Sequence, residues 1–234
     1  MRKVPPQTGE FYHIYNRGVD KREIFYCHDD FARFIRNMRL VNNESKANKR
    51  DFIKREEIKR LQVSETGYPV SETKRLAEHK LLDYISELPR LVEIICYCLM
   101  SNHYHLILKQ LVEDGISKFM QSLNIAYSNY FNTKYNRTGT LFESKFKSVH
   151  LKDDDMLLWT SGYVNGNSQI HKIAKAENYQ WCSYQDYLNK RSGTLCNKNI
   201  ILNQFKDIIS YREFVELVIE ECQGRKDMQK LIIE

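Results

Sequence analysis

Residues 91–109, LVEIICYCLMSNHYHLILK, consist of two apolar runs on either side of a short polar step. The first run, residues 91–100, is long enough for one buried strand, and residues 103–109 predict a second. Only Ser101 and Asn102 separate them, and a connection this short is typical of two antiparallel strands. We therefore expect a β-hairpin in the middle of the fold.

Helices and further strands surround this hairpin in an irregular alternation. In chain order we expect a strand at 11–16, a helix capped by Asp29 and Asp30 and running to Asn42, the hairpin, a helix at 114–135, an extended segment at 141–151, a helix that begins at Asp153–Asp155, and helices near 210–222 and 225–233. This order predicts an α+β fold, a ferredoxin-like antiparallel sheet with helices packed on it.

Two segments lie outside this pattern. Residues 43–89 are rich in charge and helical in period, with a break at 66–69, and predict a helical insertion. The chain after about residue 190 predicts C-terminal helices. We expect a catalytic domain at 1–190, which contains the 43–89 insertion, and a C-terminal helical extension at 191–234.

The composition excludes several classes of protein. The net charge is +6, from 36 basic and 30 acidic residues, which fits a nucleic-acid partner without requiring one. Six cysteines occur without any CxxC pair, so we expect reduced thiols and neither a disulfide framework nor a zinc finger. No apolar run reaches the roughly 18 residues of a membrane span, and the N-terminus is unlike a signal peptide. We expect a cytoplasmic protein without a membrane partner.

His103 and His105 are the first candidates for chemistry. Residues i and i+2 of a strand point to the same face, so both imidazoles can converge on one divalent metal ion. An HxH pair also occurs by chance, and on spacing alone two partly exposed strand histidines are the simpler interpretation.

Tyr163 and Asn167 are the second candidates. They are four residues apart on an expected helix, which places both side chains on one face about 6 Å apart along the axis. A tyrosine with a pKa of about 10 needs activation before it attacks phosphorus, and a metal ion at the target phosphate can provide it. Taken alone, Tyr163 is one of fifteen tyrosines, and a packing residue is the better interpretation.

The third candidate is a basic and aromatic segment, YFNTKYNRTGTLFESKFKSVHLK, at residues 130–152. Its cations can follow a phosphate backbone while its aromatic rings stack on unpaired bases. A solvated loop followed by an ordinary strand explains the same composition. The candidate DNA-binding residues are Arg17, Lys134, Arg137, Lys145 and Lys147.

Several stretches, in order along the chain, resemble the single-tyrosine HUH transposases, in particular the REP-associated tyrosine transposase branch. CLMSNHYHLILK is similar to the HUH motif region, where the pattern MPNHxHLL is characteristic. The other matching stretches are FYHIYNRG (11–18), IFYCHDDFARF (24–34), GISKFMQSLNIAYSNYFNTKYNRTGTLFESKFKS (115–148), LLWTSGYVNGNSQIHK (157–172) and WCSYQDYL (181–188). Together they cover most of residues 9–42 and 91–188.

The resemblance implies a role for each candidate. It makes His103 and His105 metal ligands, Asn167 a third ligand, and Tyr163 the nucleophile that forms a 5′-phosphotyrosine. The implied metal is Mg²⁺ or Mn²⁺, and the implied substrate is single-stranded DNA that carries a hairpin. The resemblance implies an enzyme of DNA transposition, a single-strand endonuclease and strand transferase. Both a monomer and a homodimer agree with the sequence.

The sequence departs from the family pattern around the nucleophile. Relatives read roughly Arg-Tyr-Ile-Glu-x-Asn-Pro where this chain reads GYVNGNS at 162–168. The missing arginine removes a phosphate contact, and each glycine costs a helix about 1 kcal/mol relative to alanine. Two alternatives therefore remain: a hairpin-DNA-binding protein of this fold with weakened catalysis, and a metal-binding protein unrelated to DNA.

Overall fold

A computed structural model describes residues 5–43 and 88–224 of the chain. Nearly all of the helical insertion expected at 43–89 lies outside the described residues, as does the helix expected near 225–233. Within the described ranges, no helix combines the length and the apolar character that crossing a membrane requires.

Four antiparallel strands form one sheet in the order β2-β3-β1-β4. The strands are β1 (Phe11–Arg17), β2 (Val92–Met100), β3 (His103–Gln110) and β4 (Lys147–Leu151). Helix α1 (His28–Leu40) follows β1, and helix α4 (Gly115–Lys134) follows β3. This βαββαβ order and the strand order together confirm the predicted ferredoxin-like sheet and its central hairpin.

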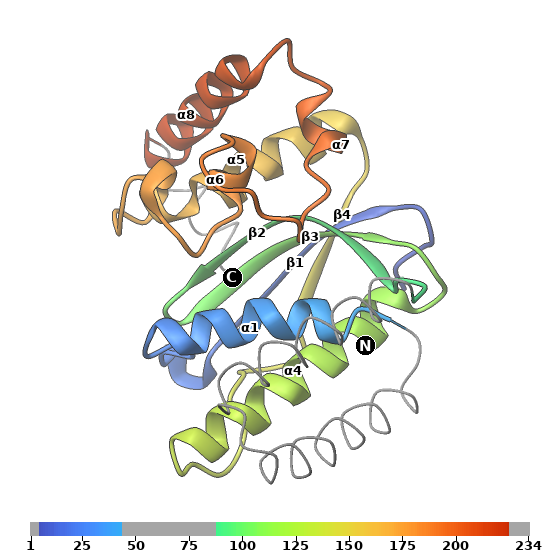
Figure 1. Cartoon of the computed structure of the whole chain (residues 1–234), viewed down its shortest axis with the longest axis vertical. Coiled ribbons are helices and arrows are strands. Elements are labelled where there is room, and N and C mark those ends of the chain that lie inside the picture. The colour runs from blue at the N-terminus through green and yellow to red at the C-terminus, as the bar shows by residue number, and fades with distance from the viewer. Residues whose placement is uncertain (1–4, 44–87, 225–234) are drawn as a thin grey trace, which may run out of the picture.

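Helices cover both faces of the sheet, which makes three layers (Figure 1). Helices α1 and α4 lie on one face, and the chain after β4 lies on the other. That second layer contains α5 (Asp154–Ile170), α6 (Tyr184–Tyr187), α7 (Asn199–Leu202), α8 (Ile208–Gly224) and a short 3₁₀ turn, η2 (Ala176–Asn178). A second 3₁₀ turn, η1 (Val19–Lys21), connects β1 to α1. Strand residues alternate between the two layers, as the pleat requires.

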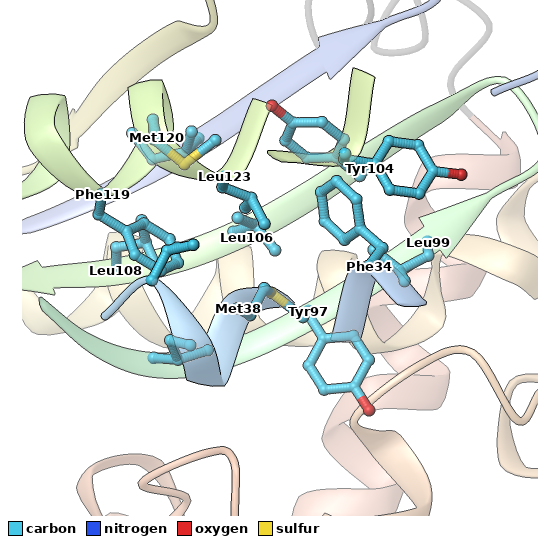
Figure 2. Packing of buried hydrophobic residues seen from close by; sticks show 14 of the residues in the cluster. Phe34, Met38, Tyr97, Leu99, Tyr104, Leu106, Leu108, Phe119, Met120 and Leu123 are labelled. Atoms are coloured by element: carbon cyan, nitrogen blue, oxygen red, sulfur yellow. The ribbon is translucent and has the colours of Figure 1, made fainter. Parts of the chain in front are cut away.

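The layer of α1 and α4 packs on the sheet through large apolar side chains (Figure 2). Phe34 and Met38 of α1 meet Phe119 and Leu123 of α4 over the strands, and all four side chains are fully buried. The strand side chains drawn beneath them are Tyr97, Leu99, Tyr104, Leu106 and Leu108. On β3 the residues facing this layer are Tyr104, Leu106 and Leu108, so the alternate residues His103 and His105 point to the opposite layer.

Two local predictions were wrong. Helix α1 begins at His28 with Cys27 as its N-cap, so the expected cap, Asp30, lies inside the first turn. Its buried carboxylate accepts hydrogen bonds from the backbone N–H groups of Tyr26 at 2.8 Å and Cys27 at 3.3 Å. The segment expected to be extended from 141 forms a strand only from Lys147.

Glycines in α5 allow α8 to pack closely on it. A Cβ atom at Gly166 would lie 2.5 Å from Ile219 Cγ1, and one at Gly162 would lie 3.0 Å from Val218 Cγ2. The intrinsic helix penalty of these glycines is therefore offset by contact between two helices whose side chains fill one buried cluster.

We expect Gly166→Val to lower the free energy of unfolding by about 1–3 kcal/mol, because the added side chain overpacks the α5–α8 contact. Urea denaturation measures the difference. Gly224→Val is the matched control, since a Cβ there meets nothing within 4 Å. Equal stability of the two variants would show that close packing at Gly166 is not needed.

Candidate active site

Three histidines from two paired strands lie together on the α5 side of the sheet. His103 and His105 come from β3 and His13 from β1. The ring centroid of His105 is 5.1 Å from that of His103 and 5.1 Å from that of His13. His105 is only 1% exposed, so the interpretation of two partly exposed strand histidines does not describe this residue.

Burial keeps these imidazoles neutral. It lowers the pKa of His13 to about 4 and that of His103 to about 3, and it lowers the pKa of His105 well below its ordinary value. The neighbouring histidines shift the pKa of His105 in the same direction. A metal ligand must offer a lone pair, so a neutral imidazole is the form that coordination requires.

Each histidine of the β3 pair has one nitrogen engaged and one without a partner. His103 Nδ1 lies 2.6 Å from Asn102 Oδ1, and His105 Nδ1 lies 2.9 Å from His13 Nε2. Within residues 5–43 and 88–224, the Nε2 atoms of both rings are buried and have no hydrogen-bond partner within 3.5 Å, and the same holds for both side-chain polar atoms of Asn167. Buried polar atoms are nearly always paired, so such a group needs an explanation.

A divalent cation that accepts both imidazole nitrogen and oxygen ligands would satisfy these unpaired atoms. Two imidazoles and the Asn167 amide oxygen would make up the protein's share of the ligands. Across residues 5–43 and 88–224, no three His, Cys, Asp or Glu side chains form a group suited to a metal ion. A site here therefore depends on the amide and on oxygens from outside the protein.

Tyr163 projects from α5 toward the histidines. Its ring centroid is 5.5 Å from that of His105, and its ring stacks on Trp159 at 6.0 Å with an interplanar angle of 3°. Tyr163 is 2% exposed, and this burial raises the pKa of its hydroxyl. The nearby Asn167 amide shifts the same pKa in the opposite direction, by less. The phenol is therefore protonated at neutral pH and needs a proton acceptor before it can attack.

Two neighbouring cavities border these groups. The larger, of about 320 Å³, is lined by His103, His105 and several basic side chains. The smaller, of about 260 Å³, is lined by Tyr163, His13 and Trp159. Tyr15 lines both cavities.

The candidate DNA-binding residues divide into two groups. Arg17 and Lys147 line the larger cavity, where Arg17 pairs with Glu143 and Lys147 Nζ lies 5.8 Å from the centre of the Tyr15 ring. Lys134 instead lies at the end of α4, where its Nζ is 2.7 Å from the buried carboxylate of Asp30.

The two other basic candidates lie outside the lining of this cavity. The Arg137 guanidinium is 5.6 Å from the centre of the Phe131 ring near the end of α4, and Lys145 is exposed before β4. The structure thus brings Arg17 and Lys147 to the histidines, and it places Lys134 and Arg137 on the α4 side of the sheet.

Three site residues were missed from the sequence: His13, Tyr15 and His171. His171 lines the larger cavity, and its ring centroid is 5.7 Å from that of His103. Its signal was present, because it follows Asn167 by four residues, at the C-cap of α5, close to the face that carries Asn167. His13 and Tyr15 alternate with core residues on β1, but the partner strand of β1 was not readable from the sequence.

Comparison with known proteins found a family match, and it covers a segment that includes this site. Residues 79–179, somewhat less than half of the chain, match the family described as "Transposase IS200 like". This range includes His103, His105, Tyr163 and Asn167. No curated protein matches the chain. Among solved structures, "Structure of the REP associates tyrosine transposase bound to a REP hairpin" matches with 9% identity and a TM-score of 0.41, covering 81% of this chain and 87% of that one.

Proposed function

Because residues 79–179 match the IS200-like transposase family, we propose that this protein is a metal-dependent single-stranded DNA endonuclease and strand transferase with Tyr163 as its nucleophile. One observation carries the proposal. The buried, unpartnered Nε2 atoms of His103 and His105 and the unpartnered amide of Asn167 lie in the same layer as a buried tyrosine whose ring contacts His105.

His103, His105 and Asn167 would hold Mg²⁺ or Mn²⁺ in this proposal. When bound, the ion would neutralise charge on the scissile phosphate and orient its oxygens. The protein's part is to keep both imidazoles neutral, which their burial favours, and to hold each ring through a contact at its Nδ1.

The proposed reaction keeps the energy of the broken phosphodiester bond in a covalent bond between the DNA and Tyr163. The Tyr163 oxygen forms a bond to phosphorus, the phenol loses its proton, and the bond from phosphorus to the 3′-oxygen breaks as that oxygen gains a proton. The products are a 5′-phosphotyrosine and a free 3′-hydroxyl. Attack by another 3′-hydroxyl reverses these steps and joins strands, so no external energy source is needed.

The larger cavity offers a path for the DNA backbone beside the histidines. Arg17, Lys21 and Lys147 place positive charge along it, and the half-buried ring of Tyr15 offers a surface for an unpaired base. Glu143 already pairs with Arg17, so a phosphate must compete with this carboxylate for the guanidinium. Lys147 is the cavity cation whose contact with DNA is simplest to test.

Lys147→Ala is expected to weaken binding of single-stranded DNA and to reduce the slope of log affinity against log salt by about 0.7, the value for one lost phosphate contact. Fluorescence anisotropy over a salt series measures both. Lys206→Ala, an exposed lysine before α8, is the control and should behave as wild type. A Lys147→Ala slope equal to that of wild type would remove Lys147 from the DNA path.

The activity itself is tested with a single strand that contains a hairpin, taken from the DNA beside the gene and labelled at both ends. With Mn²⁺ we expect a shorter labelled product and a protein-linked species on a denaturing gel. Neither should form with EDTA or with fully paired duplex DNA. Cleavage that is equal in EDTA would contradict the metal-dependent mechanism.

A second function is favoured by one observation. Tyr163 is 2% exposed and lines the smaller cavity, while His103 lines the larger. A nucleophile that is buried and lies in a different cavity from a metal ligand is expected in a protein that binds hairpin DNA with weakened catalysis. The altered stretch at 162–168 agrees with this function. Tight binding of the hairpin without any protein-linked product from wild type would establish this alternative.

A further inference from the structure

His13 is engaged with the histidine pair although no motif includes it. Its Nε2 lies 2.9 Å from His105 Nδ1, and the two rings stack with an interplanar angle of 18°. Both side chains are buried. His13 pairs with Ile107 in the β1–β3 ladder, so it is the diagonal neighbour of His105, and both lie on the two central strands of the sheet.

We propose that His13 is a positioning residue that fixes the tautomer of His105, so that the Nε2 lone pair of His105 faces the larger cavity. This inference rests on the proposed function, since it assigns His13 a role toward the metal ion that His105 would hold. It concerns a hydrogen bond between two neutral rings, and His13 itself does not bind the ion.

The hydrogen bond allows two arrangements. In the first, His105 Nδ1–H donates to His13 Nε2, which leaves a lone pair on His105 Nε2. In the second, His13 Nε2–H donates to His105 Nδ1, which leaves an N–H group on His105 Nε2. That atom is buried and has no partner among the residues that the structure describes, so the second arrangement would bury an unsatisfied donor. The first leaves an acceptor that a cation can use.

The surroundings of the two rings favour the first arrangement. His13 lines the smaller cavity, where water is the natural partner for a proton on its Nδ1. His103 has the corresponding hydrogen bond at its own Nδ1. Its partner there, Asn102 Oδ1, can only accept a hydrogen bond and therefore places the His103 proton on Nδ1. A hydrogen bond to the far nitrogen of a ligating histidine orients the ring and typically improves metal affinity by about 10–100-fold.

The test compares the Mn²⁺ affinity of the full chain and its variants by isothermal titration calorimetry, without DNA. His13→Phe keeps a flat ring and removes the acceptor, so we expect its dissociation constant to rise about 10–100-fold. His13→Gln retains an acceptor oxygen and should recover part of that loss. The control is His150→Phe, a β4 histidine paired with Glu10, which should bind Mn²⁺ as wild type does.

Nitrogen-15 NMR of the metal-free wild type supplies an independent measurement. We expect the proton of His105 on Nδ1, with the His105 signals identified by their loss in His105→Gln. A proton on Nε2 would overturn the inference even if His13→Phe fails to fold. Equal Mn²⁺ affinity of wild type and a folded His13→Phe would overturn it while leaving the proposed function intact. Wild type without measurable Mn²⁺ affinity would overturn both the inference and the metal-dependent function.

Discussion

Tyr163→Phe is expected to abolish the covalent adduct with DNA and to lower the rate of strand cleavage by at least about 1000-fold, because removal of a nucleophile eliminates the covalent pathway. The substitution removes one oxygen and keeps the ring that stacks on Trp159 and contacts His105. DNA binding and the fold should therefore be retained. Single-turnover cleavage with Mn²⁺, with binding measured in parallel, separates the two effects.

Tyr15→Phe is the matched control for this prediction. Tyr15 shares the histidine face with Tyr163, with its ring centroid 5.9 Å from that of His105, and it lines the larger cavity. We expect this variant to form the adduct, with at most weaker binding of the DNA strand. An adduct that survives Tyr163→Phe and is lost in Tyr15→Phe would transfer the nucleophile to Tyr15.

The tyrosines of the long helix are poorer candidates than Tyr15. Tyr127 packs in the core on the opposite face of the sheet and donates its hydroxyl hydrogen to the backbone oxygen of Ile24. Tyr130 and Tyr135 donate to the carboxylate of Asp30. Their hydroxyl groups are therefore occupied by structural hydrogen bonds away from the histidines.

His103→Ala and His105→Ala are expected to lower metal-dependent cleavage by at least about 1000-fold each, because a bound ion contributes several kcal/mol to the stability of the transition state. Mn²⁺ affinity should fall in the same variants. His105 is buried and His103 is half-buried, so each substitution leaves space in the sheet–α5 layer and also lowers stability. Thermal unfolding must therefore show that the variants are folded at the assay temperature.

His150→Ala is a suitable control for loss of a histidine, because this side chain pairs with Glu10 at 2.9 Å and stacks on Tyr12. It should cleave DNA as wild type does. Cleavage at the wild-type rate by a folded His103→Ala or His105→Ala would show that the pair does not serve the reaction, whatever its geometry.

The sequence predicted the sheet well because its signals are local. Two apolar runs with a two-residue connection specify the β2–β3 hairpin, and the spacing of Phe31, Phe34 and Met38 specifies the buried face of α1. The start of α1 was misplaced because Asp30 resembles an N-cap in sequence. In the structure its carboxylate reaches back to the N–H groups before the helix.

The site was predicted only where its residues are near one another in the chain. His103 and His105 share a strand, and Tyr163 and Asn167 share a helix, so periodicity places each pair on one face. His13 reaches His105 through the pairing of β1 with β3, and no local pattern specifies that register.

The same limit explains the division of the basic segment. Lys134 and Lys147 are 13 residues apart, yet the chain leaves α4 and enters β4 between them. Lys134 therefore lies beside Asp30 and Lys147 beside the histidines. Likewise, the low helix propensity of Gly166 predicted a weaker α5. The close approach of α8 to this glycine was not predicted, because it depends on residues more than fifty positions later.

Peptide mapping of the trapped protein–DNA adduct tests the central claim most directly. Wild type is incubated with the hairpin-bearing single strand and Mn²⁺, digested with protease and nuclease, and analysed by tandem mass spectrometry. We expect a nucleotide 5′-phosphate on the peptide that contains Tyr163, linked to that side chain. The absence of any adduct, or an adduct confined to another tyrosine, would contradict the assignment of Tyr163 as the nucleophile.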